Sequence, residues 1–167
     1  AKLEVVKGGK EGKSALSLLA EEQGKLVLAN IKPGFFGLQG QLVYPDSGYN
    51  FHFWARANGA KEVQYLPSLL VWKNGAAADA APEVIPAQTK LVSGEAWAMQ
   101  EAFVTPPADA ARIAVALVVE NAKAGEGLVI DGFAVNRKDT KGLQGVSVAK
   151  IRAQCEIPLQ PKWDDAS

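Results

Sequence analysis

The sequence has one cysteine, one histidine and no surplus of charge of either sign. Cys155 alone cannot form an internal disulfide or a cysteine-rich zinc site, and His52 alone excludes a multi-histidine metal centre. Eighteen Lys and Arg residues balance eighteen Asp and Glu residues, so no net positive field attracts a nucleic acid or an anionic membrane. We therefore expect neither as a partner.

Long apolar runs and enzyme motifs are also missing. The longest uninterrupted apolar runs, such as residues 113–119, are well under the roughly 20 residues that span a bilayer. The sequence has no glycine-rich phosphate loop that opens a helix and no Gly-x-Ser-x-Gly nucleophile turn. A glycosidase needs two carboxylates across a cleft, for which Glu95, Glu101 and Glu120 are the candidates. Because carboxylates at strand ends are usually solvated, we expect no enzyme.

What the 167 residues do contain is alternation with a period of two. Tyr49, Phe51, Phe53 and Ala55 alternate with polar or aromatic neighbours, and residues 112–120 alternate in the same way. Successive side chains of a strand point to opposite faces, so this pattern predicts strands with one buried face. Further strands are expected at residues 3–6, 14–19, 25–31, 63–73, 88–92, 96–105, 127–136 and, more weakly, 146–152.

Glycine, asparagine and proline turn signals separate these runs, and no amphipathic helix stands out. The chain is long enough for one domain with its own core. We therefore predict an all-β fold, a single antiparallel β-sandwich. Residues 74–86 are expected to form a long loop, because alanines without an apolar period offer no face to bury. Residues 138–167 are expected to be a connector with an extra strand and a tail beyond a domain at 1–137.

Four segments, in order, carry a family resemblance: residues 12–18, 48–56, 96–119 and 128–135. Gly48-Tyr49-Asn50-Phe51-His52-Phe53-Trp54-Ala55-Arg56 is the richest of them. Together they resemble the β-sandwich carbohydrate-binding modules of the family 4, 9, 16 and 22 type, found in bacterial polysaccharide-degrading enzymes. The resemblance covers residues 3–137. It implies a jelly-roll, galactose-binding-like sandwich that is secreted, extracellular or at the cell surface, and is covalently linked to catalytic or surface modules. It also implies a poly- or oligosaccharide ligand, bound on a concave sheet face or at loop tips.

The main candidate ligand site follows from the alternation at residues 49–56. If Tyr49, Phe51 and Phe53 face the core, then Asn50, His52, Trp54 and Arg56 share the opposite face. Sugars offer C–H faces that stack on an indole and hydroxyls that pair with His, Asn and Arg. Two alternatives remain open: loops or the C-terminal tail cover this face with Trp54 as a packing residue, or the face contacts a protein partner.

Other aromatic and charged residues are secondary candidates. Trp72, at a strand end beside a turn, is either a loop-tip platform or a packing residue. Arg112 and Glu120 belong to the strand of residues 112–120, whose outward alanines form a groove floor or lie beneath a loop. Trp97 falls at the core tryptophan of the resembled family and shares a face with Phe103, so it is expected to be buried. The tail residue Trp163 has no predicted place.

The resemblance also implies a structural calcium ion, with Asp131 as a ligand by position. Glu11 and Glu4 are further candidate carboxylates, because calcium takes six to eight oxygen ligands. The sequence departs from the family at both ends of this site. The usual Gly-Asp-Phe-Glu is replaced by Leu3-Glu4-Val5-Val6, and a doubled aspartate by Asp131-Gly132. The alternative is an aspartate that accepts hydrogen bonds from backbone amides.

The sequence thus predicts a non-catalytic polysaccharide-binding module that tethers an appended enzyme or surface protein to glycan. The alternative is a structural or protein-interaction β-sandwich of a secreted or cell-surface assembly. In that case the outward face of residues 50–56 would lie against a partner.

Overall fold

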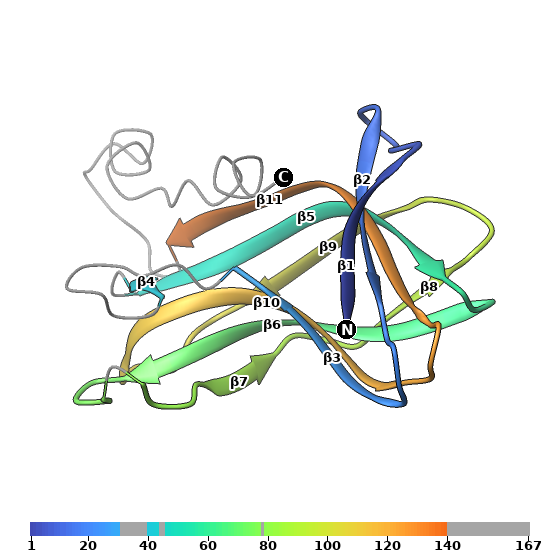
Figure 1. Cartoon of the computed structure of the whole chain (residues 1–167). Helices are drawn as coiled ribbons and strands as arrows, with labels where there is room; N and C mark the ends of the chain where they lie inside the picture. Colours follow the sequence, from blue (N-terminus) through green and yellow to red (C-terminus); the bar gives the residue numbers. More distant parts are fainter. Residues whose placement is uncertain (31–39, 44–45, 78, 140–167) are drawn as a thin grey trace.

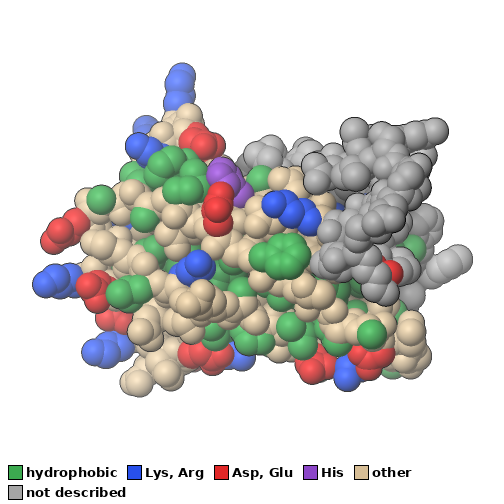
Figure 2. Space-filling model, turned by 180° about the vertical axis from the view of Figure 1, so that it is seen from behind, with side chains coloured by type: hydrophobic (Ala, Val, Ile, Leu, Met, Phe, Trp, Pro, Cys, Tyr) green, Lys and Arg blue, Asp and Glu red, His purple; other side chains and the backbone are tan. Residues whose placement is uncertain are grey.

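The computed structural model describes residues 1–30, 40–43, 46–77 and 79–139, which form two antiparallel sheets packed face to face (Figure 1). These residues contain strands and turns and no helix, and hence no helix able to cross a membrane. Seen from behind the view of Figure 1, the surface carries charged and hydrophobic side chains together with the histidine (Figure 2). The predicted all-β, antiparallel sandwich is confirmed.

Two sheets with different outer faces make up the sandwich. Sheet A has the strand order β1 (Lys2–Lys7), β2 (Ser14–Leu19), β11 (Gly127–Asp139), β5 (Ser47–Asn58) and β9 (Ala98–Val104). Sheet B has the order β3 (Gly24–Ala29), β10 (Ala110–Ala122), β6 (Glu62–Lys73) and β7 (Glu83–Pro86). The short strands β4 (Gln41–Leu42) and β8 (Lys90–Ser93) pair with β10 and β6. Many neighbours within a sheet are distant in sequence because the chain passes repeatedly from one sheet to the other, as in a jelly roll.

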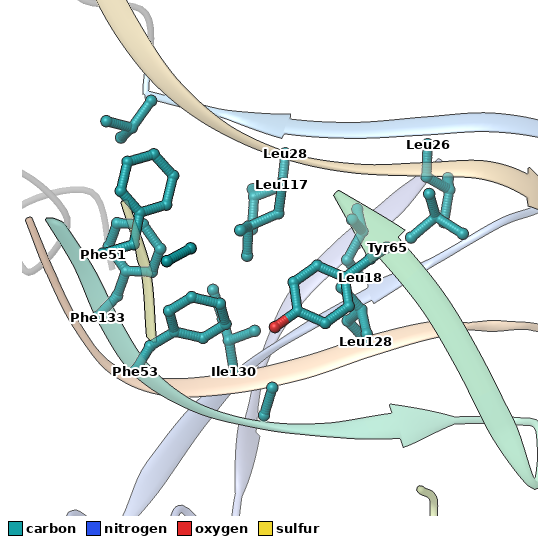
Figure 3. Packing of buried hydrophobic residues seen from close by; sticks show 14 of the residues in the cluster. Leu18, Leu26, Leu28, Phe51, Phe53, Tyr65, Leu117, Leu128, Ile130 and Phe133 are labelled. Atoms are coloured by element: carbon teal, nitrogen blue, oxygen red, sulfur yellow. The ribbon is translucent and has the colours of Figure 1, made fainter. Parts of the chain in front are cut away.

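The core lies between the sheets and is built from the inward set of each strand. Phe51, Phe53 and Tyr65 are 0 to 1% exposed and lie among leucines from both sheets (Figure 3). The Phe53 ring lies 5.2 Å from Phe133 and 6.1 Å from Tyr65, in the tilted and edge-on arrangements that aromatic pairs favour. The Tyr65 hydroxyl donates to Gln100 Oε1 over 2.6 Å, and burial raises the pKa of Tyr65 far above its ordinary value.

A β-bulge in β11 sets which of its side chains face outward. Asp131 pairs with Trp54 and Ala134 pairs with His52, so β11 has one residue more than β5 over this stretch. Gly132 supplies the extra residue with φ of 60°, a conformation that glycine adopts without a steric penalty. As a result Asp131 and Ala134 point outward, and Phe133 between them is 7% exposed in the core.

Two segments differ from the sequence prediction. Residues 83–86, expected to be loop, form β7, in which Val84 and Ile85 pair with Leu70 and Leu69 of β6. The prolines of this segment favour a loop in a prediction from sequence. An edge strand nevertheless tolerates Pro86, because one side of its backbone needs no partner. The predicted strand at 88–92 is β8, from Lys90 to Ser93, and β4 was not predicted. Strand β11 continues to Asp139, and the expected strand at 146–152 lies outside the described residues.

The outer face of sheet B carries a cluster of apolar side chains that are buried from solvent. Leu70, Trp72, Ala114, Ala116 and Val118 form a second apolar cluster there, each at most 4% exposed. The residues packed against this cluster include Ala76 and Ala80 from the segment after β6, and the indole Nε1 of Trp72 donates to the carbonyl of Ala80 over 2.9 Å. The outward alanines of β10 therefore lie beneath other residues and do not form an open groove floor.

Candidate functional site

The outer face of sheet A is the exposed counterpart. Along β5, Phe51, Phe53 and Ala55 are fully buried, whereas Asn50, His52, Trp54 and Arg56 are half-buried and point away from the core, as the alternation predicts. These four side chains extend over ~20 Å, since a strand advances about 3.3 Å per residue.

Strand β9 adds a second row of side chains beside them. Phe103 pairs with Asn50, Glu101 with His52 and Met99 with Trp54, and directly opposed residues of antiparallel strands share a face. Phe103 is 47% exposed and Met99 is 37% exposed. The Phe103 ring also lies against Gly48, where an added Cβ would collide with it.

Trp97, expected in the core, lies instead on this outer face. It precedes β9 and is half-buried, with the guanidinium carbon of Arg56 5.2 Å from its ring centroid. The prediction was wrong because the inward set of β9 is Gln100, Ala102 and Val104. The residues that alternate with this set, Trp97 and Phe103 among them, therefore face outward.

Strand β11 provides the third row, with Asp131 beside Trp54, Ala134 beside His52 and Asn136 beside Asn50. We call these outward side chains the sheet A face: Asn50, His52, Trp54, Arg56, Trp97, Met99, Glu101, Phe103, Asp131, Ala134 and Asn136. Figure 2 views this side, with the histidine next to an acidic side chain and hydrophobic side chains to either side. The acidic neighbour of His52 is Glu101, with 4.0 Å between Nε2 and Oε1.

The loop between β1 and β2 contacts this face at its Trp54 end. The hairpin that carries it projects beyond the body of the sandwich (Figure 1). Glu11 Oε1 accepts a hydrogen bond from Trp54 Nε1 over 3.0 Å, and Lys10 Nζ lies 4.9 Å from the centroid of the Trp54 ring. Asp131 holds the loop in place, because its Oδ2 accepts from the amides of Glu11 (2.8 Å) and Gly12 (3.4 Å).

The predicted calcium ligands are arranged in a way that does not fit a calcium site. The oxygens of Asp131 accept from three backbone amides, the third being Gly132 N to Oδ1 over 2.8 Å. Glu11 is turned to the Trp54 indole, and Glu4 on β1 pairs with Lys2 over 3.5 Å. Calcium needs a shell of oxygens, whereas N–H donors surround this carboxylate. Among the described residues no three His, Cys, Asp or Glu side chains form a group able to hold a metal. Calcium binding stays a prediction for measurement.

The secondary candidates lie on sheet B, away from Trp54. Trp72 is 1% exposed, so its ring offers no stacking surface, and the Arg112 guanidinium lies 5.6 Å from its centroid. Glu120 is exposed at the end of β10. It lines a hollow of about 430 Å³ together with Glu62, Gln64, Thr89, Asn121 and Glu126, among others.

The structure therefore brings together the four β5 candidates and Asp131 with Glu11. It leaves Trp72, Arg112 and Glu120 on sheet B and Glu4 on the edge strand β1 of sheet A, separated from β5 by two strands. Sequence reasoning missed Phe103, Met99, Asn136 and Lys10 as members or neighbours of the site. The available signal was the reversed pattern of β9, in which large apolar residues alternate with an inward glutamine.

The architecture defines a two-sheet jelly-roll sandwich with one exposed, aromatic outer face. The sequence matches no protein-family profile and no curated protein sequence. Solved structures match the fold. They include the CBM22-1 xylan-binding domain of Xyn10C from Paenibacillus barcinonensis (TM-score 0.55, 11% identity, covering 80% of this chain and 79% of that one). The C-terminal family 22 carbohydrate-binding module of Clostridium thermocellum Xyn10B gives a TM-score of 0.51 at 18% identity, covering 81% and 80%.

A third structure contains the CBM22-1 and GH10 modules of Clostridium thermocellum xylanase Xyn10B with xylohexaose. It gives a TM-score of 0.54 at 14% identity and covers 82% of this chain but 24% of that one. This chain therefore has the fold of family 22 carbohydrate-binding modules.

Proposed function

We propose that this chain is a non-catalytic polysaccharide-binding module whose ligand lies along the sheet A face. The observation that supports this most is the row of Trp54, Trp97 and Phe103 on one outer face, interleaved with hydrogen-bonding side chains. Rings of this kind stack on the C–H faces of sugars, and the amides of Asn50 and Asn136 can donate to and accept from hydroxyls.

The face is suited to a chain of sugars more than to a single ring. Its β5 row alone extends over ~20 Å and is open at the side chains of β9, where Phe103 and Glu101 are exposed. Since the Paenibacillus barcinonensis module of the same fold is described as xylan-binding, xylan and other β-linked polysaccharides are the first ligands to test. One of those modules is joined to a GH10 module, and we propose likewise an extracellular protein in which this domain is linked to a catalytic or surface module.

The contacts of the carboxylates on this face support the proposal of a non-catalytic module. A glycosidase needs one carboxyl group to protonate the leaving oxygen and a second as nucleophile or base across the scissile bond. Here Asp131 is held by backbone amides and Glu11 by the Trp54 indole. Glu101 is exposed beside His52. We therefore expect a bound glycan to be recovered intact after long incubation.

Affinity electrophoresis and calorimetry on a panel of plant, algal and mucin polysaccharides test this proposal. Phe103→Ala is expected to weaken binding about 5- to 150-fold, from a stacking contact of roughly 1–3 kcal/mol by analogy with bases on aromatic rings. The matched control is Leu91→Ala, which truncates an equally exposed apolar side chain on β8 and should leave affinity unchanged.

Three results would contradict the proposal. If Phe103→Ala and Leu91→Ala bind alike, the ligand does not lie on the sheet A face. If no polysaccharide is retained and the face instead captures a protein, the interaction-domain alternative is correct. Release of reducing ends that is lost in Glu101→Gln would show that the face is catalytic.

A further inference from the structure

We propose that the ligand of the sheet A face is an anionic polysaccharide, with uronic-acid carboxylates bound by Lys10 and Arg56. This inference rests on the proposed function and adds the chemical class of the ligand. It comes from the observation that, among the described residues, the cations beside Trp54 and Trp97 lack a carboxylate partner, whereas two nearby carboxylates accept hydrogen bonds.

The two cations lie on tryptophan rings and have no carboxylate partner among the described residues. Lys10 Nζ is 4.9 Å from the Trp54 centroid, and the Arg56 guanidinium is 5.2 Å from the Trp97 centroid. Within the described part of the chain, no Asp or Glu oxygen lies within 4.0 Å of either cation. A cation stacked on an aromatic ring keeps N–H donors directed away from the ring, available to another acceptor.

Two carboxylates at the same face, Asp131 and Glu11, are in contrast already engaged. Asp131 accepts three backbone amides, and Glu11 accepts the Trp54 indole N–H. Glu101 on β9 is exposed and lies opposite His52, with 4.0 Å between Nε2 and Oε1. The described face therefore offers a ligand two unpaired cations at its Trp54 end. Lys138, opposite Gly48 and exposed, adds a third beyond Phe103.

The spacing suits a carboxylate carried by a stacked sugar. Trp54 and Arg56 are two residues apart on one face of β5, which separates them by ~7 Å, about the width of a sugar ring and its substituent. A pyranose on either tryptophan would place an equatorial carboxylate beside Arg56 or Lys10. Guanidinium binds carboxylate through two parallel N–H donors, and such charge-assisted bonds are about twice as strong as neutral ones. Neutral sugars need no such cations, because hydroxyls are served by Asn50 and Asn136.

Matched polymer pairs test the inference directly. Glucuronic-acid-substituted xylan, polygalacturonate and alginate are each compared with the same polymer after its carboxyls have been reduced to alcohols. We expect at least one acidic polymer to bind about tenfold or more tightly than its reduced form, with the difference shrinking as salt rises.

Variants of the whole described domain assign the effect. Lys10→Gln and Arg56→Gln should each remove most of the preference for the acidic polymer, whereas the charge-preserving Lys10→Arg should keep it. Lys25→Gln, an exposed lysine of β3 on sheet B, is the matched control and should change nothing. Circular dichroism confirms that each variant is folded.

Three outcomes overturn the inference. Equal binding of acidic and reduced polymers, with Phe103→Ala weakening both, refutes the anionic class and leaves the proposed function standing. A preference for acidic polymers that survives both glutamine variants refutes the roles of Lys10 and Arg56. Failure of every polymer in the panel, acidic or neutral, refutes the proposed function and the inference together.

Discussion

Two tryptophans on opposite outer faces provide a matched test of which sheet binds. Trp54 on sheet A is half-buried, whereas Trp72 on sheet B is 1% exposed. Replacing each with alanine removes the same side chain from the two environments. We expect Trp54→Ala to reduce glycan affinity with a modest loss of stability, and Trp72→Ala to reduce stability with no direct loss of affinity.

The structure gives both magnitudes. Trp54→Ala removes a stacking ring worth roughly 1–3 kcal/mol, or about 5- to 150-fold in Kd. It also removes the hydrogen bond to Glu11 and the contact with Lys10, each about 0.5–1 kcal/mol at an exposed site, which lowers the Tm by about 2–8 °C. Trp72→Ala opens a cavity in the second apolar cluster and leaves the Ala80 carbonyl unpaired. The cost is about 3–5 kcal/mol, or a Tm lowered by about 6–20 °C.

The assay is calorimetric titration well below the lower Tm, with thermal melts of both variants and of Trp54→Phe. The phenylalanine variant keeps a ring without the indole N–H, so it should keep most of the affinity. The reasoning is refuted if Trp54→Ala binds like the parent, or if folded Trp72→Ala no longer binds. Unfolding of Trp54→Ala would show that Trp54 is a packing residue.

Three further predictions concern the support of this face and the core. Gly48→Ala should displace the Phe103 ring and weaken glycan binding, and it should add nothing in a Phe103→Ala background, which a double-mutant titration measures. A chelator should leave the Tm unchanged, because amides occupy Asp131; a Tm lowered by chelator, restored by calcium and insensitive to both in Asp131→Asn would establish a calcium site. Tyr65→Phe should cost about 1–3 kcal/mol in urea unfolding by leaving Gln100 Oε1 unpaired. Burial raises the pKa of Tyr65, so its contribution to stability is intact below the unfolded value near 10 and is lost as pH rises above it, which tyrosinate absorbance follows.

Local alternation in the sequence is enough to predict the strands and one row of the site. In β5 the inward residues are large and apolar and the outward ones are not, so the orientation of His52, Trp54 and Arg56 follows from period two alone. Which strands lie beside β5 does not follow. The pairing of β5 with β9 and β11 joins segments about 50 and 80 residues apart, and nothing local in the sequence encodes that register.

Three strands show how apolar residues on the outer face of a sheet affect a prediction from the sequence. In and just before β9 the apolar residues Trp97, Met99 and Phe103 face outward, so a rule that places large apolar residues inside assigns them to the wrong face. In β6 and β10 the apolar runs are nearly continuous, which is typical of strands covered on both sides. That pattern already distinguishes Trp72, in a run buried on both faces, from Trp54, in a strictly alternating strand.

Because the two outer faces differ, we expect that substitutions on the sheet A face can change the proposed ligand recognition without changing the fold. The sheet A face draws its side chains from β5, β9 and β11 and from the β1–β2 loop, and these positions alternate with, and do not contribute to, the phenylalanine-rich core. The hydrogen bonds between strands fix the spacing of these side chains in the free protein, so binding requires little loss of conformational entropy. Under the proposed function, we therefore expect substitution on this face to act mainly on affinity and on the choice between neutral and acidic glycans. The same change on sheet B acts on stability, because Trp72 and its apolar neighbours already have their partners within the chain.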